Sequence, residues 1–266
     1  MCRLLAFRCR EPIPICRSLI GGDNSFAVQS LEHPDGWGLA YYVDRIPHVV
    51  KSILPAISDR QFERFSLAVE SRTLLAHIRR ATTGQISSRN CHPFQFGPWV
   101  FAHNGFIRNF SAVRNDLRQK LERRFRKLII GETDSEVFFY LFLTYLGQEG
   151  DLFDPDISES AMATALARAT RDVQEVADVG PAVDFQGPDQ SWLSVLVTNG
   201  ANMMVSRLGR SIAYQRTLSQ AGDDLVMFSS EVIGGLNTRE DSGWVDLRDG
   251  EYLFVKPDLQ VSQGSL

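Results

Sequence analysis

Met1-Cys2-Arg3-Leu4-Leu5-Ala6-Phe7 opens this chain of 266 residues, and its second residue decides how the fold and the function are interpreted. A small residue follows Met1, so we expect an aminopeptidase to remove Met1. Cys2 would then carry a thiol and a free α-amine, which are the nucleophile and the base of one catalytic pair. Their ordinary pKa values, about 8.5 and about 7.7–8.0, lie near neutral pH. A cysteine here can also be a small apolar residue that starts a strand, so the rest of the chain must discriminate.

Composition restricts the class of protein. With 44% hydrophobic and 23% charged residues the sequence is typical of a globular protein, and we expect a single domain over residues 2–266. A net charge of -4 argues against a general nucleic-acid binder. We recognise neither a secretory signal nor an apolar stretch that could span a bilayer, so we expect a cytoplasmic protein without a membrane partner. In that compartment the four cysteines are expected to stay reduced.

Hydrophobic periodicity predicts strands toward both ends of the chain and helices between them. The expected strands cover 2–8, 36–43, 47–53, 73–79, 99–103, 192–198, 201–208, 211–216, 224–230 and parts of 244–263. The expected helices cover 24–32, 58–69, 110–128, 134–146 and 158–178, with loops at 11–15, 81–98 and 178–190. Asn199-Gly200 between two strands predicts a type I′ hairpin. Such hairpins favour an α/β (α+β) fold with mainly antiparallel sheets, and no glycine spacing typical of a nucleotide-binding parallel sheet is present.

Two of the predicted helices carry further information. Apolar residues recur at every fourth position in 110–128, and basic residues occupy the opposite face. A basic face can bind RNA, but no aromatic residues are interleaved with these bases, so a solvated surface is the preferred interpretation. The helix 134–146 is apolar on nearly every side, which indicates a position between layers of structure.

Two segments place candidate functional groups at the ends of strands. In AHIRRATTG (76–84), Arg79 could clamp a carboxylate with two parallel hydrogen bonds, although a lone surface arginine is the more common case. In HNGFIRN (103–109), the Asn104 side-chain amide and the Gly105 backbone N–H could point at one spot as two donors for an oxyanion. Asn-Gly is also a common turn sequence, so this segment alone does not decide between the two interpretations.

Two further segments are compatible with a binding pocket. In GETDSE (131–136), Thr133 with Glu136 three residues later predicts a capping box, and Asp134 in the first turn suits the helix dipole. The same cap would fix the direction of Asp134, which could then hold an ammonium group. DGWGLAYY (35–42) indicates close backbone packing or a pocket wall at the start of a strand.

Together these segments resemble the class II glutamine amidotransferases, which are N-terminal-nucleophile hydrolases, and in particular their small stand-alone members. The resemblance rests on Cys2 after Met1 followed in order by DGWGLAYY (35–42), AHIRRATTG (76–84), CHPF (91–94), HNGFIRN (103–109) and GETDSE (131–136). It is most specific over residues 2–140. It implies a four-layer α-β-β-α sandwich of two stacked, mainly antiparallel sheets.

The resemblance also implies roles for individual residues. Cys2 would be the nucleophile with its own α-amine as base, and Asn104 and Gly105 would form the oxyanion hole. Arg79 would bind the α-carboxylate of glutamine and Asp134 its α-ammonium. Two more residues would complete the substrate pocket, with Thr82 in the loop that shapes or covers it and His103 beside the substrate. The implied reaction is hydrolysis of the glutamine γ-amide through a thioester, which requires no metal and no cofactor.

Several alternatives remain open at this point. Arg79 and Asp134 recognise only the glutamyl half of a substrate, so they fit two activities equally. One is a glutaminase that feeds ammonia to a separate synthase subunit, and the other is a γ-glutamyl amide hydrolase that acts on a larger metabolite or peptide. An amidase of the bile-salt or penicillin type would not need segments built for an amino-acid zwitterion. A non-catalytic subunit is disfavoured because every proposed catalytic residue is present, and a metal hydrolase using Cys91, His77, His92 and His103 is disfavoured by their spacing.

Overall fold

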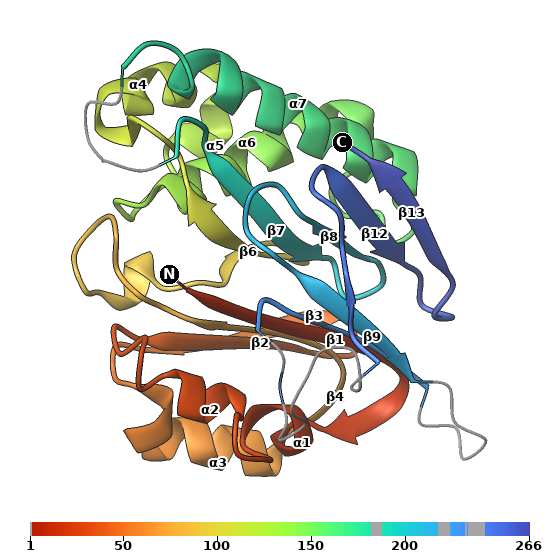
Figure 1. Ribbon diagram of the computed structural model, residues 1–266. Helices are drawn as coiled ribbons and strands as arrows, with labels where there is room; N and C mark the ends of the chain where they lie inside the picture. Colours follow the sequence, from red (N-terminus) through yellow and green to blue (C-terminus); the bar gives the residue numbers. More distant parts are fainter. Residues whose placement is uncertain (1, 182–187, 218–223, 232, 234–242) are drawn as a thin grey trace.

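Two antiparallel sheets form the centre of this computed structural model, which describes residues 2–181, 188–217, 224–231, 233 and 243–266 (Figure 1). Within the described residues the first sheet has the strand order β11-β9-β10-β1-β4-β2-β3. Its strands are β1 (Arg3–Pro14), β2 (Trp37–Val43), β3 (Ile46–Ser52), β4 (Glu70–Ile78), β9 (Ala213–Thr217), β10 (Leu225–Ser229) and β11 (Val245–Asp246). The second sheet has the order β13-β12-β8-β7-β6-β5. Its strands are β5 (Phe94–Phe96), β6 (Trp99–Phe106), β7 (Trp192–Thr198), β8 (Met203–Ser206), β12 (Glu251–Val255) and β13 (Val261–Ser265).

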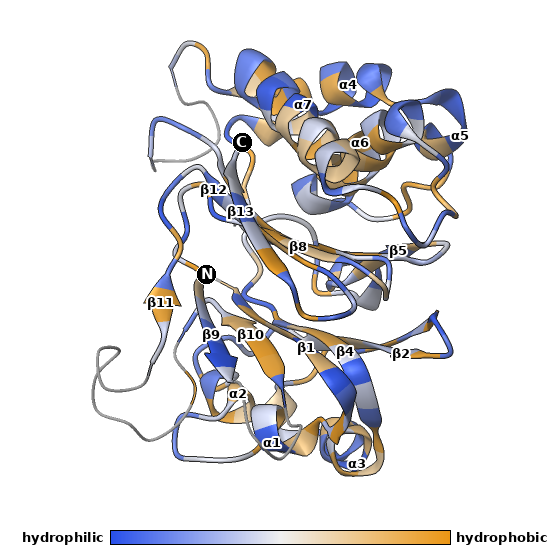
Figure 2. Cartoon of the chain, turned by 90° about the vertical axis from the view of Figure 1, so that its right-hand side faces the viewer, coloured by the Kyte–Doolittle hydropathy of each residue, from blue (hydrophilic) through white to orange (hydrophobic). Residues whose placement is uncertain are grey.

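Helices cover the outer face of each sheet, so the layers run helix, sheet, sheet, helix (Figure 2). The first sheet is covered by α1 (Cys16–Leu19), α2 (Phe26–Gln29) and α3 (Arg60–Ala68), with a 3₁₀ turn η1 at Ala56–Ser58. The second sheet is covered by α4 (Phe110–Lys120), α5 (Arg123–Arg126), α6 (Asp134–Glu149) and α7 (Glu159–Ala177). A second 3₁₀ turn, η2, covers Ser88–Asn90 in the loop before β5. The predicted four-layer α-β-β-α sandwich of antiparallel sheets is confirmed.

Strand alternation carries the candidate site residues into the layer between the two sheets. Leu4 and Ala6 of β1 lie in the apolar cluster between the sheets, as does Ala102 of β6. Side chains along a strand alternate between its two faces. Cys2, two residues before Leu4, and Asn104, two residues after Ala102, therefore continue the middle-layer faces of their segments. The fold places the proposed nucleophile and a proposed oxyanion donor in the same layer.

The stretch 11–15 differs from its prediction as a loop, because β1 runs on to Pro14. The pairing of β1 with β4 breaks after Arg8 and resumes at Ile13, which pairs with Ser71. The extra residues bulge out of the ladder, and proline is tolerated at a bulge because its missing N–H is not needed there. Reading each proline as the end of a strand is therefore wrong for this stretch.

The predicted helix 110–128 is two helices. The first, α4, ends at Lys120, and the next residue, Leu121, has extended backbone angles of φ -70° and ψ 145°. The following N–H, that of Glu122, donates to the Thr144 hydroxyl of α6 at 3.1 Å, so a tertiary contact fixes the break. In contrast, α6 matches its prediction, since apolar residues on most of its sides are buried.

The hairpin at Asn199-Gly200 is wider than the predicted type I′ turn. Strands β7 and β8 pair as far as Thr198 and Met203, which leaves a loop of residues 199–202. The Asn199 side-chain oxygen accepts the backbone N–H groups of Ala201 at 3.0 Å and Asn202 at 2.8 Å. Asparagine can turn the chain through its own side chain, and here that turn replaces the tighter one.

Candidate active site

Cys2 lies just before β1, at the edge where β1 begins and its antiparallel neighbour β4 ends. Its sulfur lies 3.5 Å from the backbone nitrogen of Arg80 and 3.6 Å from the Arg80 carbonyl oxygen. The residue is half-buried, but the sulfur packs against this backbone. The predicted nucleophile is thus held at a defined position at the mouth of the inter-sheet layer.

The surroundings of Cys2 keep its thiol protonated. Burial raises the pKa of the Cys2 thiol above its ordinary value, and the negative charge of Asp134 adds to that rise. The Arg80 N–H and the positive charge of Arg79 lower the pKa but do not cancel the effect of burial. A thiol in this state needs a base to become a nucleophile.

Arg79 is buried at the end of β4, and its guanidinium holds the loop that follows. Its terminal nitrogens donate to the carbonyl oxygens of Gln85 at 3.0 Å, Thr83 at 2.8 Å and Gly84 at 3.4 Å. An arginine has five N–H donors, so these bonds do not exhaust it. Thr82 is exposed in the same loop, which places it at the surface beside Arg79.

Asn104 and Gly105 are neighbours on β6, and each has an unusual environment. The Asn104 side chain is buried, and its amide oxygen has no hydrogen-bond partner within the described residues. A buried amide oxygen without a partner is rare and calls for an explanation such as a ligand. At Gly105 a Cβ would lie 1.8 Å from the Trp192 carbonyl oxygen, so only glycine fits this position. The segment is a continuous part of β6, not the turn that its Asn-Gly sequence also allowed.

His103 faces the helical layer, on the opposite side of β6 from Asn104. Its Nε2 lies 2.8 Å from the Trp192 carbonyl oxygen, which can only accept, so Nε2 carries the proton. Its Nδ1 then accepts from the Ser135 hydroxyl at 2.9 Å. Burial lowers the pKa of His103, whereas the Asp134 charge and the Trp192 carbonyl raise it, and the net shift is downward. Both ring nitrogens are hydrogen-bonded, and the bond to Ser135 joins β6 to α6.

Asp134 begins α6 and is buried, with both carboxylate oxygens engaged. One oxygen accepts the backbone N–H of Ile107 at 2.7 Å, and the other accepts the N–H of Ser135 at 2.8 Å. The predicted Thr133 cap is present, since its hydroxyl accepts the Glu136 N–H at 3.3 Å. The reciprocal half of the capping box is wrong. The Glu136 carboxylate instead accepts the N–H groups of residues 130 and 131 at 3.2 and 2.7 Å.

Two residues that the sequence did not single out hold the start of β1 and the end of β4. The Ser230 hydroxyl accepts the Leu4 N–H at 2.9 Å, and the Ser230 N–H donates to the Leu4 carbonyl at 3.0 Å. The Asp35 carboxylate accepts the Ala81 N–H at 2.8 Å. Asp35 could have been found from its place before Gly36 in a loop that starts a strand, whereas Ser230 carries no local signal.

A second pair joins the loop after Arg79 to the segment before Asp134. The Glu132 carboxylate accepts the Gln85 N–H at 2.9 Å, and the Asn90 side chain bonds both the Glu132 N–H and the Gln85 carbonyl at 2.9 Å. The Gln85 N–H, followed by the Asn90 amide, lowers the pKa of Glu132. The two segments that carry the opposite charges of the candidate site are thereby fixed to each other.

The residues of the alternative metal site are not arranged as ligands. The rings of His77 and His92 lie with their centres 4.2 Å apart and are tilted by 44°, while both nitrogens of His103 are hydrogen-bonded elsewhere. Among the described residues no group of three or more His, Cys, Asp or Glu side chains is placed to hold a metal ion.

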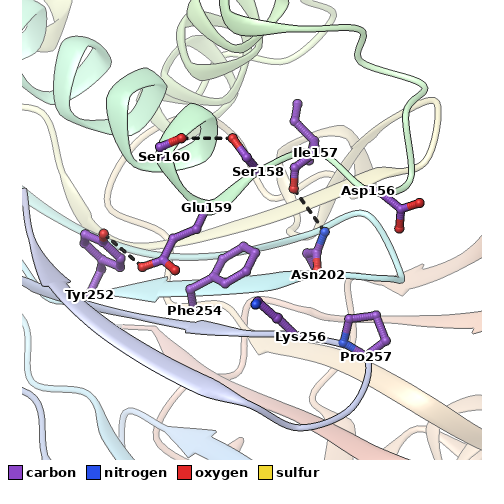
Figure 3. Close-up of a pocket in the computed structure, with 10 residues that line it drawn as sticks. All are labelled: Asp156, Ile157, Ser158, Glu159, Ser160, Asn202, Tyr252, Phe254, Lys256 and Pro257. Atoms are coloured by element: carbon purple, nitrogen blue, oxygen red, sulfur yellow. Dashed lines mark hydrogen bonds between the residues drawn. The ribbon is translucent and has the colours of Figure 1, made fainter.

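A pocket of about 600 Å³ lies at the N-terminus of α7, and none of the candidate residues lines it (Figure 3). One of its two acidic residues, Glu159, accepts hydrogen bonds from the Tyr252 hydroxyl at 3.2 Å and the Ser262 hydroxyl at 2.5 Å. The described lining contains no cysteine or histidine, so we do not associate this pocket with the chemistry of Cys2.

Comparison with known proteins identifies the family of this chain. Residues 1–185 match the sequence family described as "Glutamine amidotransferases class-II". The chain is 31% identical over 229 residues to "Probable glutamine amidotransferase DUG3" of Saccharomyces cerevisiae, covering 78% of this chain and 63% of the yeast protein. Over 78 residues, 29% of this chain and 34% of the other, it is 36% identical to "Gamma-glutamyl-hercynylcysteine sulfoxide hydrolase" of Mycobacterium tuberculosis. A solved glutamine aminotransferase class-II domain protein from Silicibacter pomeroyi has the same fold, with a TM-score of 0.67, 24% identity and 99% of both chains covered.

The chain therefore belongs to the class II glutamine amidotransferase family, and it is an enzyme of that family. The resemblance deduced from the motifs is confirmed. No helix in the described part of the chain combines the length and the apolar character that crossing a membrane requires.

Proposed function

We propose that this enzyme hydrolyses the γ-amide of glutamine through a thioester on Cys2. The observation that carries the proposal is the position of Asn104, whose buried side chain continues the strand face that lies between the sheets, as Cys2 does on its own segment. The Asn104 amide oxygen has no partner within the described residues, and the donor in the proposal is the NH2 group of the same amide. Two opposite charges, on Arg79 and Asp134, lie close enough to Cys2 to act on the pKa of its thiol. Glutamine carries a carboxylate, an ammonium and a side-chain amide. A site with a cation, an anion and a nucleophile beside a hydrogen-bond donor has one group for each of these.

The proposed reaction starts from a protonated thiol and a neutral α-amine, which exists on Cys2 once Met1 is removed. The amine takes the thiol proton, and the sulfur attacks the amide carbon. The Asn104 amide and the Gly105 N–H donate to the oxyanion that forms, and each such donor is worth about 10²–10³ in rate. The protonated amine then gives its proton to the leaving ammonia. Water hydrolyses the thioester in the second half, which releases glutamate and restores the thiol.

Recognition of the substrate is proposed to use groups that already hold the site together. Arg79 would bind the α-carboxylate with the N–H donors that the loop carbonyls leave unused. Asp134 would bind the α-ammonium with lone pairs that its two backbone hydrogen bonds leave free. Thr82, exposed in the loop, would cover the pocket, and His103 would position β6.

A γ-glutamyl amide hydrolase is the second candidate, with a larger metabolite or peptide as substrate. A pocket of about 330 Å³ opens beside Arg3, the residue after Cys2, and Gln29 and Glu32 also line it. That space could take a leaving group larger than ammonia. The similarity to the mycobacterial hydrolase over 78 residues points the same way. If glutamine is the substrate instead, a separate synthase subunit is the proposed acceptor of the ammonia.

Two further features of the protein remain proposals. We propose that residues 2–266 form one domain, which is supported by the first sheet, because it combines β1–β4 with β9–β11. We propose a cytoplasmic location, which is supported by the four free cysteines, because thiols stay reduced there.

The nucleophile can be tested by intact mass measurement of the purified protein with and without a diazoketone analogue of glutamine. The expected result is loss of Met1 and addition of one analogue, and the adduct should map to Cys2. Cys16→Ala is the matched control, since Cys16 is also a half-buried free cysteine. Retained Met1 in active protein, or labelling that survives Cys2→Ala, would overturn the mechanism.

The substrate can be tested by measuring kcat/KM for free glutamine beside a panel of γ-glutamyl amides. A higher value for glutamine supports the first candidate, and a higher value for amides with large leaving groups supports the second. Loss of all these activities in Cys2→Ala but not in Cys16→Ala is required by both.

A further inference from the structure

Another pocket, of about 490 Å³ and distinct from the two described above, lies away from Cys2 at the far end of β1. Four arginines line it, Arg8, Arg10, Arg45 and Arg72, together with two acids, Asp44 and Glu70. Arg8 is six residues along the strand from Cys2, and at about 3.3 Å per residue this corresponds to roughly 20 Å. None of the residues proposed for catalysis lines this pocket.

Arg8 is the buried centre of the pocket wall, with only 5% of its surface exposed. Its Nη1 donates to the Thr73 hydroxyl at 2.5 Å and to the Gly200 carbonyl. Its Nε is buried without a partner, and its Nη2 makes no hydrogen bond within the described residues. Nη2 is not among the buried unpartnered atoms, so it is the nitrogen of Arg8 that an anion in the pocket can reach.

The charges around Arg8 do not neutralise it. Arg10 pairs with Asp224 and Arg72 with Glu11, whereas Arg8 forms no ion pair within the described residues. Burial lowers the pKa of Arg8 to about 10, and the charges of its arginine neighbours contribute to this. Arg8 therefore keeps its positive charge at neutral pH. A buried charge without a counter-ion is costly, so a site of this kind favours an anion that supplies one.

The wall of the pocket is already formed in the absence of any ligand. The Tyr42 hydroxyl donates to the carbonyl oxygens of Pro98 at 2.7 Å and Thr198 at 3.1 Å, which joins the two sheets at this point. Arg45 stands at the tip of the β2–β3 hairpin with a φ of 67°, in a tight turn that fixes its backbone. A preformed pocket of this volume is within the size range of small-molecule sites.

We propose that this pocket binds a small metabolite through a phosphate or carboxylate group, with Nη2 of Arg8 as the principal contact and Arg45 as a second cation. The pocket is independent of the proposed reaction at Cys2. Phosphate and carboxylate groups both present negatively charged oxygens to an arginine, and the experiment below distinguishes between them.

The test is titration calorimetry of the full chain with inorganic phosphate, pyrophosphate and citrate, at constant ionic strength set with sodium chloride. Saturable binding at one site is expected for at least one of these anions. Tighter binding of phosphate and pyrophosphate identifies a phosphate-bearing ligand, and tighter binding of citrate identifies a carboxylate-bearing one. Heats no larger than those of added chloride, for all three anions, overturn the proposal.

Variants locate the site. Arg8→Met should weaken binding at least about tenfold, since it removes the charged guanidinium. Because Arg8 is buried and this variant can fail to fold, Arg45→Asn provides the second measurement, and asparagine tolerates the positive φ. A several-fold weakening by Arg45→Asn is expected. Arg171→Gln, at an exposed arginine of α7, is the control and should leave the affinity unchanged. Equal affinity in Arg45→Asn and in the unaltered protein overturns the proposal.

Discussion

Asp134→Asn separates two roles of one carboxylate, because the structure assigns it backbone hydrogen bonds and the proposed function assigns it an ammonium group. Each carboxylate oxygen accepts one backbone N–H, from Ile107 and from Ser135. Asparagine keeps one acceptor oxygen, so one of these buried N–H groups loses its partner. We expect a loss in the free energy of unfolding of about 1–3 kcal/mol. The same change removes the anion that would hold the substrate ammonium.

The second effect is larger and appears in the kinetics. Truncating one partner of a buried charge pair costs about 2–5 kcal/mol, which corresponds to roughly 30-fold to several-thousand-fold in kcat/KM. Asp59→Asn is the matched control. Asp59 also begins a helix, and its oxygens accept the Gln61 N–H at 2.9 Å and the Trp37 indole N–H at 3.0 Å. It should lose similar stability and keep its KM for glutamine.

The measurements are urea unfolding for both variants and initial rates of glutamate release over a range of glutamine concentrations. The expected pattern is equal loss of stability with a raised KM in Asp134→Asn alone. If both variants change KM to the same extent, the effect comes from a weakened fold. If Asp134→Asn leaves KM unchanged, Asp134 is a helix-start residue only, and the proposed ammonium site is wrong.

Three further predictions follow from the same contacts. Gly105→Ala should unfold or inactivate the protein, because its Cβ would collide with a backbone oxygen at 1.8 Å. Gly147→Ala inside α6 should instead gain about 0.5–1 kcal/mol in the free energy of unfolding, since its Cβ would meet the flexible end of Arg124 at 3.3 Å and Leu152 at an ordinary contact distance of 3.8 Å. Comparable urea midpoints for the two variants would contradict this reasoning. Burial holds the pKa values of His77 and His92 well below their ordinary value of about 6.5, so the unfolded chain binds more protons than the folded one as the pH falls through that value. Stability should therefore fall between pH 7 and pH 5, by about 2 kcal/mol for each of these two histidines. The His77→Leu variant should show a loss smaller by about 2 kcal/mol in urea unfolding, and an unchanged pH dependence would be inconsistent with this expectation. Because the pKa of the Cys2 thiol is raised, its alkylation by iodoacetamide should accelerate about tenfold per pH unit between pH 7 and 8, followed by the mass of the N-terminal peptide, and a rate independent of pH would refute a protonated resting thiol.

Local patterns predicted the parts of the site that depend on neighbours in the sequence. The cap at Thr133 and the helix start at Asp134 follow from short-range rules of capping, and the strand 99–103 from strand patterning. The continuation of that strand through Asn104 and Gly105 was not predicted, because Asn-Gly is also a turn sequence. The four-layer sandwich came from the resemblance of whole motifs to a family and not from the periodicity alone. Periodicity assigns an element to a face, and it does not say which elements will meet.

The sequence patterns did not predict contacts between segments that are distant along the chain. The hydrogen bonds between Ser230 and Leu4, and those between Asn90 and Glu132, join residues whose local sequences carry no sign of each other. The interruption of β1 after Arg8 is of the same kind, since it depends on where β4 resumes pairing. The hairpin at Asn199-Gly200 was predicted, but its turn type was wrong for a different reason. Two turn geometries are compatible with one Asn-Gly sequence, and the surrounding strands decide between them.

The bond between Ser230 and Leu4 also sets an order of events during synthesis. The start of β1 lies between β4 and the β10 segment, and the latter is made only when about nine-tenths of the chain has been translated. Until then the N-terminus lacks one of its two neighbours, and an enzyme that removes Met1 can reach it on the growing chain. On the proposed mechanism, removal of the initiator thus comes before assembly of the site. On the same proposal, a growing chain that lacks β10 would not yet hydrolyse glutamine, and activity would begin only after β10 pairs with the first residues made.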